Sequence, residues 1–199
     1  MDSKRRLEEI FAHFPGIGPR QAKRFVYYIQ SRSAATVKEL SDLIEEVRRA
    51  TGECSECHRF FIETNHKSAV CSICSDTSRD RSLLMIVARD SDFETVEKSG
   101  AYRGLYFILG GTVPVLDKDP EKRIRLKQLM QKLSKNEPAE VILSLSATPD
   151  GENTVEVLKR AFSSAKGARV SILGRGLSTG AELEYVDSDT IKNALENRH

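Results

Sequence analysis

The sequence predicts an α+β protein built of several modules, and three observations support this fold class. Residues 1–50 repeat apolar side chains at helical spacing, which indicates a small helical module. Residues 51–80 hold all four cysteines and little periodicity, so something other than an apolar core must hold them. From residue 81 onward, short apolar runs alternate with amphipathic segments, which is typical of a parallel sheet covered by helices. We expect the latter part to divide into 81–174 and 175–199.

The composition places the chain among ordinary water-soluble proteins and excludes a membrane protein. Of its 199 residues, 39% are hydrophobic and 30% are charged, and no apolar run approaches the roughly 18 residues that a span needs. The start, MDSKRRLEEIF, mixes both charges and lacks an apolar signal region, so we expect a cytoplasmic protein without membrane contact. The whole chain carries +2, but residues 1–35 hold seven Lys or Arg against three Asp or Glu, a local charge of +4. Positive charge therefore gathers in the first module.

Two short helices in this module are predicted on either side of a turn at residues 15–19. Their apolar stripes are Leu7, Ile10, Phe11 and Phe14 before the turn, and Ala22, Phe25, Val26 and Ile29 after it. Pro19 suits the first turn of a helix, so the second helix is expected to begin there. A third helix follows, for which Thr36 and Glu39 have the spacing of a capping box.

The turn itself, PGIGP, is the first candidate binding site. Gly16 and Gly18 can take positive φ without steric cost and leave backbone N–H groups uncovered. The pattern resembles a helix-hairpin-helix motif, in which such N–H groups grip a phosphate, and it is followed by cations at Arg20, Lys23 and Arg24. Phosphate contacts do not read bases, so the expected binding to DNA is independent of sequence. The alternative is a plain tight turn with a solvated basic helix behind it.

The four cysteines form a candidate zinc site. They are Cys54, Cys57, Cys71 and Cys74, spaced C-x2-C-x13-C-x2-C. Two C-x-x-C turns bring four thiolates readily onto one tetrahedral Zn²⁺, and a shell closed by four cysteines leaves no position for water, so the zinc would be structural. A cytoplasmic setting disfavours the alternative of stable disulfides. His58 and His66 lie inside this knuckle and could replace a cysteine.

The α/β pattern after residue 81 predicts four strands and three helices. The expected strands are 83–88, 105–109, 140–145 and 169–173. The expected helices are 92–99, 121–133 and 154–163, the first opened by a capping box at Ser91 and Glu94 and stopped at Gly100.

Acidic residues follow two of these strands. Asp90 follows the first strand, and Asp150 and Glu152 follow the third. Because functional groups gather beyond the carboxyl ends of parallel strands, these carboxylates could chelate Mg²⁺, as phosphoryl-transfer enzymes require. The alternative is that they are solvated or cap the helices that follow.

Taken in order, these features resemble the RecR family of recombination mediators across nearly the whole chain. The residues that carry the resemblance are FPGIGPRQA (14–22), the two cysteine pairs, RDRS (79–82), YRGLYFILGG (102–111), EVIL (140–143), DGENT (150–154) and RGLSTGAELEYVD (175–187). The resemblance implies a Toprim domain within 81–199 and a Walker B-like segment at 175–187. It also implies a DNA clamp: a homo-oligomer, a dimer closing to a ring, that works with RecO and RecF and has no firmly assigned catalysis.

Three features depart from the family pattern. The gap between the cysteine pairs is longer than usual, Asp90 and Asp150 stand where the family typically has Glu, and residues 112–121 lack a glycine-rich pattern. In this interpretation the acids Asp90, Asp150 and Glu152 face partners or a weakly held Mg²⁺. The rival hypothesis is a small Mg²⁺-dependent Toprim nuclease acting on DNA.

Overall fold

The structure is a computed structural model that describes residues 2–62, 69–117, 119–163, 168–174 and 176–196. Its contacts divide the chain into two compact units, Met1–Thr51 and Gly52–His199, and each is described by itself. The predicted fold class is confirmed: helices come first, then a four-cysteine cluster, then an α/β domain with a parallel sheet.

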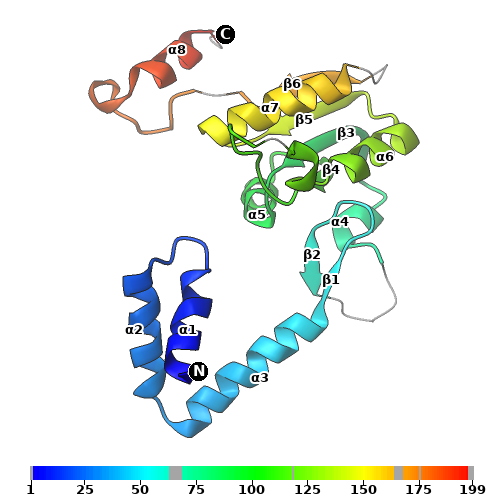
Figure 1. Cartoon of the computed structure of the whole chain (residues 1–199). Helices are drawn as coiled ribbons and strands as arrows, with labels where there is room; N and C mark the ends of the chain where they lie inside the picture. The colour runs from blue at the N-terminus through cyan, green and yellow to red at the C-terminus, as the bar shows by residue number, and fades with distance from the viewer. Residues whose placement is uncertain (1, 63–68, 118, 164–167, 175, 197–199) are drawn as a thin grey trace. The chain divides into compact units, whose positions relative to one another are not determined.

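The first unit consists of three helices, α1 (Ser3–Ala12), α2 (Pro19–Gln30) and α3 (Ala34–Ala50). Helices α1 and α2 lie side by side (Figure 1), and Phe11 of α1 meets Phe25 of α2 edge-to-face at 5.7 Å between ring centroids. The predicted start of α2 at Pro19 is confirmed. The predicted capping box of α3 is wrong, because the helix begins earlier and the Ser33 hydroxyl accepts the Thr36 N–H.

Helix α3 leaves an apolar stripe uncovered by its own unit. Four side chains at helical spacing along it are 44% to 61% exposed: Leu40, Leu43, Ile44 and Val47. A helical stripe of this kind normally packs against another element. The unit therefore presents an apolar surface of its own.

The second unit opens with the cysteine-rich segment, which we call the knuckle. It comprises the two-stranded sheet of β1 (Thr51–Glu53) and β2 (Phe60–Ile62), and the short helix α4 (Ser72–Ser75). The α/β domain follows. Its strands are β3 (Asp80–Val87), β4 (Gly104–Ile108), β5 (Glu140–Ser144) and β6 (Arg169–Ile172). Its helices are α5 (Asp90–Ser99), the 3-10 turn η1 (Pro120–Lys122), α6 (Leu126–Asn136) and α7 (Pro149–Phe162).

The four strands form one parallel sheet in the order β4-β3-β5-β6. Helices α6 and α7 cover one face, where Leu129 and Leu158 are fully buried against Ile86 and Phe107 (Figure 1). Helix α5 covers part of the other face through Phe93. Apolar residues successive along β3 thus point to opposite faces and are buried on both, as a continuous apolar run predicts.

The four strands of the parallel sheet lie where the sequence predicts them, except that β3 begins at Asp80 and not at 83, and three helix boundaries differ. Helix α5 begins at Asp90, not 92, because Asp92 accepts the Arg89 N–H at 3.0 Å and closes the first turn. The predicted stop at Gly100 is confirmed, with φ of 67°. Helix α7 begins at 149 because the Thr148 hydroxyl accepts the Gly151 N–H. The helix predicted at 121–133 is η1 followed by α6.

The C-terminal segment has little core of its own. It contains the 3-10 turn η2 (Leu183–Tyr185) and helix α8 (Ser188–Glu196). Leu183 and Tyr185 are 65% and 78% exposed. None of the described helices of the chain combines the length and apolar character that a membrane span requires.

Candidate nucleic-acid interface and metal centre

Among the residues described, the turn between α1 and α2 leaves several backbone N–H groups without a hydrogen bond. Gly16 has φ of 75°, which favours glycine, whereas Gly18 has φ of −82° and stands at the N-cap of α2. No side chain caps this helix, and Pro19 contributes no N–H. Within the described part of the chain, the N–H groups of Gly18, Arg20 and Gln21 have no hydrogen-bond partner. They form an exposed set of donors at the positive end of a 12-residue helix.

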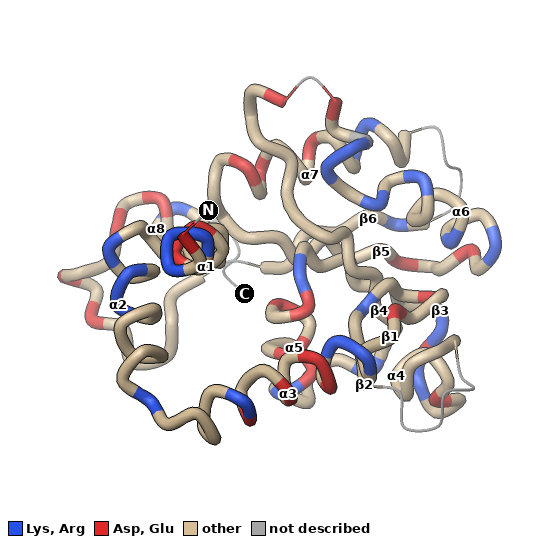
Figure 2. Tube along the Cα trace, turned by 60° about the horizontal axis from the view of Figure 1, so that its bottom comes forward, with Lys and Arg blue, Asp and Glu red and all other residues tan. Residues whose placement is uncertain are grey.

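Three basic side chains lie on α2 next to these donors. Arg20, Lys23 and Arg24 are all exposed on α2, and Figure 2 shows basic positions along α1 and α2. Arg24 donates to the Gln21 side chain at 3.4 Å, and among the described ion pairs none involves Arg20, Lys23 or Arg24. The five residues predicted to bind DNA thus occupy one turn and the two helical turns that follow it. Their contact with DNA stays a prediction.

The four cysteines converge. Their Sγ atoms all lie within 4.8 Å of one another, and all four side chains are buried. The Cys71 N–H donates to the Cys54 sulfur at 3.3 Å, and a hydrogen bond from Cys57 lowers the pKa of the Cys54 thiol. Four buried sulfurs in this arrangement match the ligand set of a tetrahedral metal site. The cluster can hold a metal ion.

Of the two histidines considered as alternative ligands, the structure describes His58, which does not enter this cluster. His58 turns its Nδ1 to the Glu53 carboxylate at 2.8 Å and its ring to Phe107. His66 lies outside the described residues. Among the described residues, the metal-binding set is therefore the four thiols.

The knuckle is fastened to the α/β domain by polar and apolar contacts. The Ile108 N–H of β4 donates to the Cys57 carbonyl at 2.8 Å, and the buried Lys132 ammonium pairs with Glu56 at 3.0 Å. Ile73 of α4 packs between the cysteine cluster and the apolar core beneath α5. The fold of the knuckle and that of the sheet are thus coupled.

The predicted acidic residues bind backbone in the structure. Asp90 accepts the Phe60 N–H of β2 at 2.9 Å, and Asp150 accepts the Val115 N–H at 3.3 Å. Each carboxylate, at the first turn of a helix, also faces the positive end of that helix. Glu152 is exposed on the first turn of α7.

These acids do not come together as a metal site. In the ranges that the structure describes, the four cysteines are the one group of three or more His, Cys, Asp or Glu side chains with converging ligand atoms. Asp90, Asp150 and Glu152 form no such group. Binding of Mg²⁺ or of a partner at these acids stays a prediction.

The segment DGENT, residues 150–154, binds the loop that follows β4, a role that its residue types did not suggest. The Asn153 amide donates to the Val113 carbonyl at 3.0 Å, and the Thr154 hydroxyl accepts the Val113 N–H at 2.8 Å. Gly151 is required by close approach, since a Cβ there would lie 1.9 Å from the Ser146 carbonyl oxygen. The N-terminus of α7 therefore holds the loop after β4 in place through these hydrogen bonds. No local pattern signals these bonds, because their partner Val113 lies 40 and 41 residues earlier in the chain.

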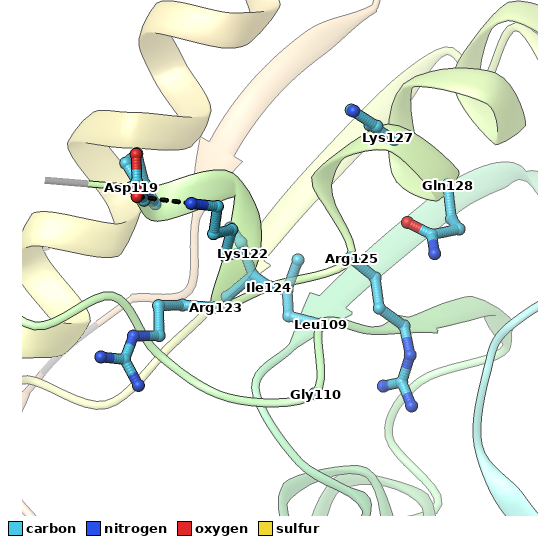
Figure 3. A pocket seen from close by; sticks show the side chains of 10 residues that line it. Leu109, Gly110, Asp119, Lys122, Arg123, Ile124, Arg125, Lys127 and Gln128 are labelled. Carbon is cyan, nitrogen blue, oxygen red and sulfur yellow. Dashed lines mark hydrogen bonds and ion pairs between the residues drawn. The ribbon is translucent and has the colours of Figure 1, made fainter. Parts of the chain in front are cut away.

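A basic hollow of about 670 Å³ lies beside the end of β4 (Figure 3). Four cations line it: Lys122, Arg123, Arg125 and Lys127. Lys122 pairs with Asp119 at 2.7 Å, Arg123 with Asp117 at 2.5 Å, and Arg125 with Glu53 at 3.4 Å. Figure 3 shows Arg123, Arg125 and Lys127 pointing apart. Three of the four cations are therefore already paired, whereas among the described ion pairs none involves Arg20, Lys23 or Arg24 of the turn and α2.

Two family models match the chain. The Toprim domain matches residues 82–174, and the model described as RecR, C-terminal, matches residues 176–199. The first range holds the four-stranded sheet, from the third residue of β3 onward, and its helices, and the second holds η2 and α8.

Similar proteins cover almost the whole chain. Recombination protein RecR of Lactococcus lactis subsp. lactis (strain IL1403) is 36% identical over 193 residues, 97% of this chain and 94% of that protein. The proteins of the same name from Tropheryma whipplei (strain Twist) and Prochlorococcus marinus (strain MIT 9312) are 34% and 31% identical, and cover 92% and 94% of this chain and 90% and 91% of their own length. Identity at this level along both chains, together with the Toprim and C-terminal matches, shows that this protein belongs to the RecR family of recombination proteins.

Proposed function

We propose that this protein is a non-enzymatic DNA clamp of recombinational repair. It binds DNA phosphates through the turn at Gly16–Gly18 and the start of α2, without reading base sequence. The names of its relatives support the recombination role. The family resemblance supports RecO and RecF as partners and a cytoplasmic location.

One observation carries the DNA-binding part of this proposal. The uncapped N-terminus of α2 offers unpaired N–H groups within the described chain, and Lys23 and Arg24 are exposed one turn further on. A helix N-terminus with free donors and adjacent cations is a ready anion site. On a chain of this family, that anion is a DNA phosphate.

Zinc is the metal we propose for the cysteine cluster. Four thiolates select Zn²⁺ among common divalent metals, and a site closed by four protein ligands serves folding. The buried positions of Cys54, Cys57, Cys71 and Cys74 support this. In this site zinc would hold the knuckle against β4.

We propose that the protein works as a homo-oligomer, a dimer that closes to a ring. Support comes from the exposed apolar stripe of α3 and from the exposed Leu183 and Tyr185, since apolar surfaces of this kind mark association. Several copies on one DNA would also multiply the few phosphate contacts of a single turn. The solution mass with and without DNA measures this directly.

Absence of catalysis is the final part of the proposal. Asp90 and Asp150 are each occupied by a backbone N–H, which supports a structural role over metal chemistry. Intact supercoiled plasmid after incubation of pure protein with Mg²⁺ is the expected result. Nicking that is lost in an Asp150→Ala, Glu152→Ala variant would favour the nuclease instead.

The test of the DNA-binding proposal is a salt series followed by fluorescence anisotropy on duplex DNA. Each lost phosphate contact reduces the log–log salt slope by roughly 0.9. Lys23→Ala with Arg24→Ala should therefore flatten the slope by up to about 2 per subunit engaged. Two unrelated sequences should give the same result.

A matched control removes one lysine and one arginine from α3 instead. Lys38→Ala with Arg48→Ala changes the net charge equally and also alters exposed positions of the first unit. We expect this control to keep most of the wild-type slope. Equal flattening by both variants, or none by either, would place the phosphate contacts elsewhere.

A further inference from the structure

Two adjacent tyrosines on α2 remain exposed. Tyr27 and Tyr28 are 54% and 57% exposed, whereas Ala22 and Val26 form the buried face of the same helix. Large aromatic side chains usually bury most of their surface, so two exposed rings in succession call for an explanation.

These rings continue the basic surface of the turn. Tyr27 follows Lys23 by four residues and Tyr28 follows Arg24 by four, so each ring lies one helical turn beyond a cation on the same side of α2. That spacing is about 6 Å along the helix axis. The helix PRQAKRFVYYIQ contains no acidic residue. Donors, cations and aromatic rings thus follow one another along α2 in two adjacent rows about 100° apart, Lys23 with Tyr27 and Arg24 with Tyr28, which together form one basic and aromatic strip.

Each ring also has a cation against one of its faces. The Lys4 ammonium lies 4.5 Å from the Tyr27 ring centroid, and the Arg32 guanidinium carbon lies 4.1 Å from that of Tyr28. Such cation–π contacts orient a ring. Beside the rings is a shallow hollow of about 650 Å³, lined by Gln21, Arg24, Phe25, Tyr27, Tyr28 and Ser31.

The positive charge around the rings indicates which kind of ligand they would bind. An apolar protein surface would gain little from a strip flanked by Lys4, Lys23, Arg24 and Arg32, whereas a strand of nucleic acid offers phosphates for the cations and flat bases for the rings. Bases within a duplex are already stacked on each other and hidden from α2. Only unpaired bases can reach the tyrosines.

We propose that Tyr27 and Tyr28 form a stacking platform for the unpaired bases of single-stranded DNA, whose phosphates are held by Arg20, Lys23 and Arg24. This inference rests on the proposed phosphate contacts and adds a preference for single strands. Because every base has a π-face, stacking of this kind keeps the binding independent of sequence.

The test compares three ligands of equal length at one salt concentration: a single strand, an abasic phosphodiester strand and a duplex. Tyr27→Ala with Tyr28→Ala should weaken binding of the single strand by about fivefold or more. Binding of the abasic strand and of the duplex should change less than about twofold, since the phosphate contacts remain. Tyr27→Phe with Tyr28→Phe keeps both rings and should bind the single strand as wild type does.

A second measurement needs no variant. The chain has no tryptophan and five tyrosines, of which Tyr102 and Tyr106 are partly or fully buried, so its intrinsic emission comes from tyrosine alone. The single strand should quench this emission and the abasic strand should not. In the double Phe variant the quenching should be lost while affinity is kept. Tyr185→Phe is the control: it keeps the ring of Tyr185, which is exposed in the other unit, and the single strand should still quench the remaining emission.

Several results would overturn the platform. One is an equal loss of affinity for single and abasic strands in the double Ala variant, and another is no loss for either. A smaller solution mass of that variant would place the tyrosines in a subunit contact instead. Failure of the phosphate contacts is a separate result, because Lys23→Ala with Arg24→Ala would then leave binding of the abasic strand unchanged.

Discussion

The carboxylate of Asp90, at the start of α5 just beyond β3, accepts the backbone N–H of Phe60 in the knuckle at 2.9 Å. Thirty residues separate the two in the chain, so this bond joins the metal-binding segment to the carboxyl edge of the sheet. A side chain one carbon longer would place its oxygens differently. The length of the aspartate side chain therefore suits this contact.

Removing this carboxylate should loosen the knuckle. In Asp90→Ala the Phe60 N–H loses its partner, and we expect a loss of about 1 kcal/mol in the free energy of unfolding. Hydrogen exchange of the β2 amides should accelerate in the variant. Asp92→Ala, which removes the cap at Arg89 instead, should leave β2 protected. Unchanged exchange at Phe60 in Asp90→Ala would contradict the contact.

Removal of a cysteine thiol should remove the bound metal. We expect about one Zn²⁺ per chain by elemental analysis. Cys71→Ser should lose the metal and unfold the knuckle, because a structural site and its fold form together. Ser55→Ala, between the first two ligands, is the control and should keep the metal. A wild-type protein that is folded and free of metal would remove zinc from the proposal.

The two glycines of the turn should respond differently to alanine. Gly16→Ala should cost about 1 kcal/mol of stability because φ is 75°, although nothing lies near the added methyl group. Gly18→Ala meets no strain and no neighbour, so its cost in stability should be limited to the weaker N-cap preference of alanine, below about 1 kcal/mol. Its methyl group would nevertheless obstruct a phosphate that approaches the backbone, and duplex binding should weaken several-fold. Anisotropy at constant salt tests this, and wild-type affinity in Gly18→Ala would argue against a backbone contact.

Acid should weaken the network that joins the start of β3 to α5. Arg79 donates to Glu97, and the Tyr106 hydroxyl donates to the same carboxylate at 2.9 Å. The Arg79 hydrogen bond lowers the pKa of Glu97. The stabilisation is therefore full above the ordinary glutamate pKa of about 4.3 and is lost as pH falls through the lowered value in the folded state.

Glu97→Gln measures this contribution. At neutral pH the variant should be less stable by roughly 1 to 2 kcal/mol in urea unfolding, and the difference should shrink towards zero in acid. Glu156→Gln removes an exposed acid paired with Lys159 and should cost far less. A difference that does not vary with pH would show that the glutamate does not act through its charge.

Much of the fold follows from local patterns. Alternating apolar strands and helices indicated the parallel sheet, and Pro19 and Gly100 marked a helix start and a helix end correctly. Cysteine spacing located the metal-binding cluster, because C-x-x-C turns set the sulfur positions locally. These features depend on neighbours in sequence.

The features that the sequence did not predict depend on contacts between distant residues. Nothing near Asp90 in the chain indicates that its partner is Phe60, and nothing near Thr154 points to Val113. The predicted capping box of α3 was wrong because several hydroxyl residues near its start could serve as the N-cap. Only Ser33 has the extended backbone that an N-cap requires. The exposure of Tyr27 and Tyr28 likewise requires knowing which face of α2 meets α1.

The bond from the Ile108 N–H to the Cys57 carbonyl has one more consequence. Strand β4 is an edge strand of its sheet. The Leu109 N–H donates to Val87 of β3, so the Ile108 N–H points away from the sheet. Outward N–H groups on a border strand are templates on which other chains can add strands and aggregate. By accepting the Ile108 N–H the knuckle covers part of this edge, so we expect chelation of the metal to leave a protein that precipitates before its sheet unfolds.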